Sequence, residues 1–178
     1  MKFGVGQPVA RHEDPKFLTG RGRYVDDIKL PGQVWGHVLR SPHAAAKILS
    51  IDTGAAKAAD GVLLVLTGAD LDAAGVGTIP CPVVPMAMGG APPKFWPRQP
   101  ALAGERVRHI GEPVAFVVAA TRAQAENAAE LIEVDYDELT PIVSTADADN
   151  EGAALVWDEA PGNLCFTIDR GDKAAADA

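Results

Sequence analysis

The strongest constraint on the fold is an order of apolar strand, short helix and second strand that occurs twice. The clearer copy begins with VAFVVAA, residues 114–120, an uncharged run of strand length that indicates a buried strand. Thr121 follows and stands three residues before Gln124, the spacing of a helix-capping box. In the helix predicted there, apolar side chains recur on one face, namely Ala125, Ala128, Ala129 and Ile132. This stripe predicts a helix that lies closely on a sheet.

The strand after this helix alternates in character. Val134 and Tyr136 are separated by Asp135 and Asp137, which predicts a half-buried strand. We expect the unit to cross over right-handedly.

The other copy lies earlier in the chain. Residues 34–40 and 46–52 read as strands, with a turn expected at Pro42 between them. Thr53 is predicted to cap a helix over residues 55–59, which Gly61 ends. The run VLLVLT, residues 62–67, is then expected to be a strand buried on both faces.

A glycine-rich stretch, GRGRYVDDIKLPGQ, precedes these strands at residues 20–33. It lacks the Lys-Ser/Thr of a phosphate-binding loop and neither follows a strong strand nor opens a helix, which excludes both nucleotide-binding motifs. We expect Gly20 and Gly22 to form turns before a strand at Tyr24 and Val25. LPGQ is predicted to form a type II turn.

Residues 73–104 form a long segment rich in proline and glycine that also carries large apolar side chains. Loops of this length are usually binding loops or disordered. Four side chains in it need a surface to cover, and they are Met86, Met88, Phe95 and Trp96. We expect them to dock onto a partner surface.

Charge and cysteine content narrow the classes of protein. The net charge of −8 excludes a partner rich in phosphates such as nucleic acid. Cys81 and Cys165 are far apart and give neither a disulfide framework nor a metal-binding spacing. No signal peptide and no membrane-spanning run is evident, so a cytoplasmic location is expected.

Catalytic patterns are absent from the sequence. The four histidines have no pair at metal-clip spacing, although His43, after Ser-Pro, is the one to examine. The acidic doublets lack the spacing of a calcium loop, and no serine sits in a Gly-x-Ser-x-Gly elbow. The residues alone therefore predict no catalytic, cofactor-binding or metal site.

Three stretches in one order carry a family resemblance. They are residues 6–52, then GVLLVLTGADL at 61–71, then residues 107–143 from VRHIGEPVAFVVAA to LTPIV. Together they resemble the N-terminal part of the large subunits of molybdenum hydroxylases, the family of xanthine dehydrogenase, aldehyde oxidase and carbon monoxide dehydrogenase. The resemblance covers nearly the whole chain.

The resemblance implies an α+β fold, the α/β-hammerhead, with a mixed sheet, the two strand–helix–strand units and the long loop. It divides the chain into an N-terminal extension and turn (1–33), the hammerhead (34–150, with the loop 73–104 inserted) and a connector (151–178). GNLCFTIDRGD, with a strand-like run LCFTID, resembles the start of that connector towards a cofactor-binding domain. The chain is expected to continue beyond Ala178.

The implied function is structural. In this family a molybdopterin-type molybdenum cofactor is bound by later domains of the same subunit, and 2Fe-2S clusters and FAD lie in partner subunits or domains. The resemblance implies that this domain packs beside the cofactor domains. The fragment by itself lacks their motifs and is expected to be inactive alone, with the loop from Val83 to Trp96 walling the substrate passage. Two alternatives stay open: a stand-alone interaction or assembly protein, and a small-ligand binding domain that uses residues 83–96.

Overall fold

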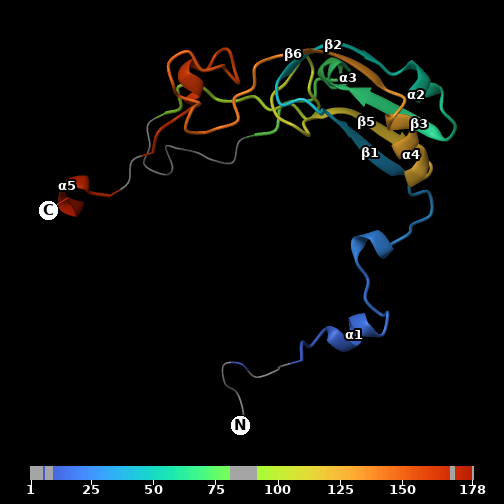
Figure 1. Ribbon diagram of the computed structural model, residues 1–178. Helices are drawn as coiled ribbons and strands as arrows, with labels where there is room; N and C mark the ends of the chain where they lie inside the picture. Colours follow the sequence, from blue (N-terminus) through green and yellow to red (C-terminus); the bar gives the residue numbers. More distant parts are fainter. Residues whose placement is uncertain (1–5, 7–9, 81–91, 169–170, 178) are drawn as a thin grey trace. The chain divides into compact units, whose positions relative to one another are not determined.

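The computed structural model describes residues 6, 10–80, 92–168 and 171–177, which divide into two compact units, 1–33 and 34–178 (Figure 1). In the first unit, helix α1 (Asp14–Leu18) is followed by a 3₁₀ turn, η1 (Val25–Asp27). The strand predicted at Tyr24 and Val25 is therefore wrong. The reason is local: the Asp27 carboxylate accepts the Tyr24 N–H at 2.9 Å and closes a turn.

Gly20, with φ +68°, and Gly32 lie in turns as expected, whereas Gly22 has no positive φ and forms no turn. Gly32 has φ +74°, and the Gln33 N–H donates to the Leu30 carbonyl at 3.1 Å, which is the arrangement of the predicted type II turn. Gly22 allows close approach, because a Cβ there would lie 2.3 Å from the Phe17 ring. That ring stacks on Tyr24 at 5.4 Å.

The second unit contains two three-stranded antiparallel sheets (Figure 1). The first has the order β1-β5-β3, and the second has the order β4-β2-β6. The strand bounds are β1 Trp35–Arg40, β2 Ala46–Asp52, β3 Val62–Thr67, β4 Arg106–Val107, β5 Pro113–Ala119 and β6 Glu133–Glu138. The helices are α2 Gly54–Ala58, α3 Gly68–Ala73, α4 Arg122–Ala129 and α5 Lys173–Ala176, with a 3₁₀ turn η3 at Pro161–Asn163.

Both predicted strand–helix–strand units are present, as β2-α2-β3 and β5-α4-β6. The two strands of each unit lie in different sheets, so the predicted right-handed crossover between parallel strands does not occur. Each helix instead links one small sheet to the other.

The main core lies where α4 packs on β1 and β5. The predicted alanine stripe is confirmed, since Ala125, Ala128 and Ala129 are all buried, as is Ile132 just after the helix. They meet Val65, Ala115 and Val117 of the first sheet. Small side chains let the helix axis approach the sheet closely.

The cap of α4 is confirmed as well. The Thr121 hydroxyl oxygen accepts the Gln124 N–H at 3.2 Å. The cap of α2 differs from the prediction, because the Thr53 side chain makes no capping bond and the Asp52 carboxylate accepts the Gly54 N–H at 2.8 Å instead. The carboxylate, one residue earlier, is the stronger acceptor.

Strand β3 is exposed where the sequence predicted burial. Val65 is buried, but Leu63 and Leu64 are 61% and 46% exposed. A register irregularity between Val62 and Leu64, at the edge of the sheet, accompanies this exposure. The alternation predicted for β6 is confirmed, with Val134 and Tyr136 half-buried and the aspartates exposed.

We expect Thr121→Ala to destabilise the second unit by about 1 kcal/mol, because the first turn of α4 loses a hydrogen-bond acceptor. Thermal unfolding measures this, and Thr121→Ser, which keeps the hydroxyl, should unfold at the wild-type temperature. Equal midpoints for the wild type and Thr121→Ala would mean that this cap contributes nothing.

A second prediction concerns pH. The Asp70 carboxylate accepts hydrogen bonds from the Thr67 hydroxyl and backbone N–H, both at 2.7 Å, and these bonds hold the pKa of Asp70 below its usual value. A carboxyl with a lower pKa in the folded chain stabilises the fold above its unfolded pKa, and this contribution is lost as the pH falls through the folded pKa. Asp70→Ala should therefore lower the thermal midpoint at pH 7, by an amount that shrinks below about pH 4.

The control for this pH series is Asp137→Ala, on the exposed side of β6, which should change the midpoint little at any pH. A deficit of Asp70→Ala that stays the same from pH 7 to pH 3 would contradict the role of the Asp70 charge.

Candidate functional site

The long loop packs partly on its own chain. Met86 and Met88 lie outside the described residues, whereas Phe95 and Trp96 lie within them. The Phe95 ring is tilted against Trp157 with centroids 5.8 Å apart. Trp96 is 39% exposed. The Phe95 ring therefore has a partner on this chain, and the expected docking of the loop on a partner surface stays a prediction.

Backbone bonds hold both ends of the described loop. Ile79 pairs with Gln99 across an antiparallel bridge, with the Ile79 N–H donating to the Gln99 carbonyl at 2.8 Å. The Lys94 N–H donates to the Cys165 carbonyl at 2.9 Å. The strand predicted for LCFTID is wrong over its described residues 164–168, which are irregular. This backbone lies against the loop instead of in a sheet.

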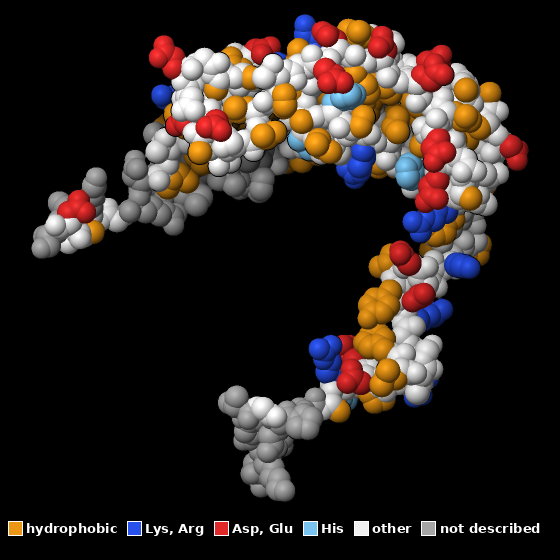
Figure 2. Space-filling model, viewed as in Figure 1, with side chains coloured by type: hydrophobic (Ala, Val, Ile, Leu, Met, Phe, Trp, Pro, Cys, Tyr) orange, Lys and Arg blue, Asp and Glu red, His pale blue; other side chains and the backbone are white. Residues whose placement is uncertain are grey.

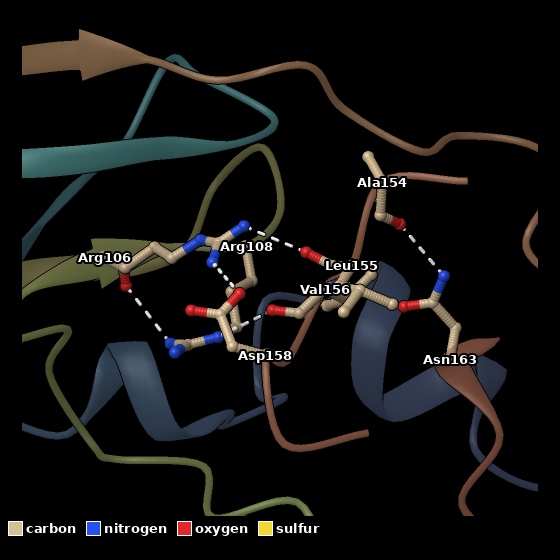
Figure 3. A network of polar contacts seen from close by, with 7 residues as sticks. All are labelled: Arg106, Arg108, Ala154, Leu155, Val156, Asp158 and Asn163. Atoms are coloured by element: carbon tan, nitrogen blue, oxygen red, sulfur yellow. Dashed lines mark hydrogen bonds and ion pairs between the residues drawn. The ribbon is translucent and has the colours of Figure 1, made fainter. Parts of the chain in front are cut away.

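Two arginines at the end of β4, Arg106 and Arg108, bind the segment around Trp157 (Figure 3). The Arg108 guanidinium lies 3.6 Å from the centroid of the Trp157 ring, a cation–π contact. Its Nε donates to the Val156 carbonyl at 3.1 Å. Burial removes water from this guanidinium and lowers the pKa of Arg108, with the Glu112 carboxylate acting in the opposite direction. Arginine nevertheless stays charged at physiological pH.

Arg106 binds the same segment from the neighbouring position. Its guanidinium donates to the Leu155 carbonyl at 2.9 Å and pairs with Asp158 at 3.0 Å (Figure 3). Asp158 is largely exposed, so its charge contributes little energy, whereas the bond to a backbone carbonyl fixes position. The two arginines together attach residues 155–158 to β4.

Asn163 shapes that attached segment from the other side. Its side-chain oxygen accepts the Val156 N–H at 2.8 Å, and its amide donates to the Ala154 carbonyl at 2.9 Å (Figure 3). The amide also donates to the Ala148 carbonyl at 2.7 Å. Asn163 itself has φ +55°, a left-handed conformation that asparagine adopts more readily than most residues. Residues 148–163 are therefore a defined loop.

A cleft of about 450 Å³ opens beside this network. Trp157 forms part of its wall, and the charged residues that line it are Lys47, Arg98, Arg106, Arg108, Asp72, Glu105, Asp158 and Glu159. The basic and acidic side chains that line the cleft are similar in number, so their charges offset one another. The lining therefore favours neither anions nor cations. Among the described residues, no cluster of three or more His, Cys, Asp or Glu has metal-binding geometry.

A buried polar junction supports the arginines. Glu112 is 4% exposed, and its carboxylate accepts the Arg108 N–H, while its carbonyl accepts the Ser41 N–H at 2.9 Å. His43, singled out from sequence, lies here, with its Nδ1 3.5 Å from Glu138 and its ring 4.7 Å from Tyr136. Burial raises the pKa of the Tyr136 hydroxyl. The Ser41–Glu112 bond ties the end of β1 to the start of β5, and the His43 contacts tie the segment after β1 to β6.

Sequence reasoning did not identify Arg106, Arg108, Trp157 or Asn163. One signal was available, because Arg-Val-Arg at 106–108 places both guanidinium groups on one side of an extended strand. Their partners are about 50 residues away, at a spacing that no local pattern encodes.

Residues 19–140 match the family model described as aldehyde oxidase and xanthine dehydrogenase, a/b hammerhead domain. The carbon monoxide dehydrogenase large chain of Afipia carboxidovorans is 40% identical over 98% of this chain, and the nicotine 6-hydroxylase large subunit of Paenarthrobacter nicotinovorans is 37% identical over 90%.

A solved structure is also similar. The Cu,Mo-CO dehydrogenase in its carbon monoxide reduced state superposes with a TM-score of 0.65 and 42% identity, over 85% of this chain and 18% of that one. The present chain spans 22% and 19% of the two curated relatives, about a fifth of their length. The resemblance and the fold inferred from the sequence are confirmed. The chain belongs to the aldehyde oxidase and xanthine dehydrogenase family, and carries its a/b hammerhead domain.

Proposed function

We propose that this chain is the structural, N-terminal domain of the large subunit of a molybdenum-dependent hydroxylase or dehydrogenase. The observation that carries the proposal is the hammerhead match over residues 19–140, within relatives of which the chain spans about a fifth. The substrate class is that of xanthine, aldehyde or carbon monoxide oxidation. The relatives include a carbon monoxide dehydrogenase and a nicotine 6-hydroxylase, so the hammerhead itself does not choose among substrates.

The cofactors belong to other parts of the proposed enzyme. A molybdopterin-type molybdenum cofactor would be held by later domains of the same subunit and would supply the oxidation chemistry. Iron–sulfur and flavin subunits would carry the electrons away. No helix in the described part of the chain has the length and apolar character needed to cross a membrane. A cytoplasmic location is part of the proposal.

The role of this chain in the proposed enzyme would be to fix where the following domain begins. We assign residues 1–33 to an extension, 34–150 to the hammerhead and 151–178 to a connector. Arg106 and Arg108 support this role for the connector, because they hold its first part against β4, and Asn163 supports it because it fixes the shape of that part from within. A domain that follows would then start from a defined place rather than from a flexible tether.

The loop is proposed to wall the substrate passage or a subunit interface, through Met86, Met88, Phe95 and Trp96. The exposure of Trp96 supports this, since a large aromatic side chain left 39% open is available for contact. Phe95 would have a supporting role, because its contact with Trp157 holds the loop on the rest of the chain.

The natural protein tests the proposal directly. An antibody raised against this domain should detect a band several times heavier than 18.6 kDa in the source cells, and the purified material should contain molybdenum. A band at 18.6 kDa, without molybdenum, would refute the proposal and favour a stand-alone interaction protein.

The loop is tested in the complete enzyme. Trp96→Ala should change the substrate KM or the yield of assembled enzyme, because it removes the exposed aromatic surface, whereas Trp96→Phe should preserve most of both. Phe95→Ala should have a similar effect through loss of its Trp157 contact. Wild-type KM and yield in both alanine variants would exclude a role in the passage or an interface.

A further inference from the structure

Arg106 has one hydrogen-bond donor that the described residues leave unpaired. Its Nη1 donates to the Asp158 carboxylate at 3.0 Å, and its Nη2 donates to the Leu155 carbonyl at 2.9 Å (Figure 3). The Nε is buried, and no protein atom in the described part of the chain accepts its hydrogen. A buried donor without an acceptor is costly, above all in a charged group, so native proteins rarely leave one.

The neighbouring arginine shows how this donor is satisfied nearby. The Arg108 Nε donates to the Val156 carbonyl at 3.1 Å. Arg106 meets the same segment of chain, but the carbonyl that it reaches, that of Leu155, is bound by its Nη2. The direct bond that serves the Nε of Arg108 therefore has no counterpart at the Nε of Arg106.

Guanidinium geometry limits where an acceptor for this hydrogen lies. The five N–H groups form a rigid planar fork, and the Nε–H and the Nη2 group share one edge of it. Nη2 is the atom that holds Leu155. An acceptor for the Nε–H would therefore lie on the side of the guanidinium near Leu155.

A small cavity of about 10 Å³ lies against both Arg106 and Leu155. Its other walls come from Ala44, Ala45, Arg108, Thr140, Ile142, Ala154 and Val156. This volume is about that needed for a single water molecule, and it is too small for a phosphate or an organic ligand. The two arginines on the wall disfavour a metal cation, because like charges repel.

The wall also supplies further polar partners. Thr140 carries the neutral polar side chain of the lining, and its hydroxyl both donates and accepts hydrogen bonds. Among the lining residues, the Ala45 carbonyl accepts the Leu139 N–H and the Ala154 carbonyl accepts the Asn163 amide. Each carbonyl oxygen keeps a second lone pair. A buried water normally makes two to four hydrogen bonds, and the cavity is polar enough for that.

We propose that this cavity binds one structural water molecule, which accepts the hydrogen of the Arg106 Nε and bonds the Thr140 hydroxyl. The chemical class of the ligand follows from the volume and from the donor, since the site takes a small neutral molecule with a hydrogen-bond acceptor. This inference does not depend on the proposed function, because it uses only residues of this chain.

The water would join stretches of chain that meet at the cavity. Ala45 comes just before β2, Thr140 follows β6, and residues 154–156 belong to the segment that the arginines hold. Arg106 itself belongs to β4. The water would thus add a bond between β4 and the chain after β6, at the place where residues 154–156 are attached.

Nuclear magnetic resonance of the 178-residue chain tests the site. A rotating-frame Overhauser experiment distinguishes contact with a bound water from proton exchange by the sign of the cross-peak. The Arg106 Hε should show a contact peak at the water frequency. The Arg108 Hε should show none, because a carbonyl accepts it, and the exposed Arg23 should show exchange at most. Exchange alone, or no peak, at the Arg106 Hε would overturn the proposal.

A matched pair of variants tests the second partner. Thr140→Val should lower the thermal midpoint by about 2–4 °C and weaken the contact peak, because valine keeps the shape of threonine but cannot bond the water. Thr140→Ser, which keeps the hydroxyl, should retain the peak and most of the midpoint. A full contact peak and an unchanged midpoint in Thr140→Val would contradict the assignment of Thr140.

Crystals of the complete enzyme give an independent measurement. A water oxygen should lie within about 3.2 Å of both the Arg106 Nε and the Thr140 hydroxyl. A protein atom that accepts the Nε–H directly, or an empty cavity at high resolution, would refute the water site and leave the proposed function standing. A natural chain of 18.6 kDa would instead refute the proposed function, and crystals of that chain would then give the same measurement.

Discussion

Burial of strand β5 is the constraint on which the second unit depends. It is the central strand of its sheet, hydrogen-bonded to β1 on one side and β3 on the other. Val114, Ala115, Val117 and Ala119 are all fully buried. Ala115 and Val117 face the core beneath α4, and Val114 faces the second core beside β4. One uncharged strand thus joins two cores, because its alternate side chains point to opposite faces.

The connector network is held through residues just before this strand. Glu112 lies immediately before β5, and it accepts the N–H of Arg108 with its carboxylate and that of Ser41 with its carbonyl. Arg108 then stacks on Trp157, which in turn contacts Phe95 of the long loop. A buried carboxylate is costly unless its hydrogen bonds are satisfied, so Glu112 favours one arrangement of its neighbours. The position of the loop is therefore coupled to the position of β5.

Local patterns predicted the elements whose determinants are local. The Thr121 cap, the alanine stripe of α4 and the alternation around Tyr136 each involve residues within one element, and the structure agrees with all three. Predictions failed where an aspartate carboxylate accepted a nearby backbone N–H: Asp52 bonds Gly54 at the start of α2, where Thr53 makes no cap, and Asp27 closes a turn at Tyr24. Arg108 stacks on Trp157, which lies far away in the sequence. A contact between such distant residues leaves no periodic pattern in the sequence.

The failure at β3 has a different physical origin. Its sequence, VLLVLT, has the composition of a strand buried on both faces, yet Leu63 and Leu64 are exposed in this chain. Hydrophobic composition reflects the environment that a strand meets in its working assembly, whichever polypeptide supplies that environment. An uncharged edge strand without proline or lysine also lacks the usual protection against pairing with other chains. The exposed leucines of β3 are then those of an edge strand, which is hydrogen-bonded to β5 on one side and has no strand on the other among the described residues (Figure 2 shows hydrophobic side chains reaching the surface of this unit among charged ones).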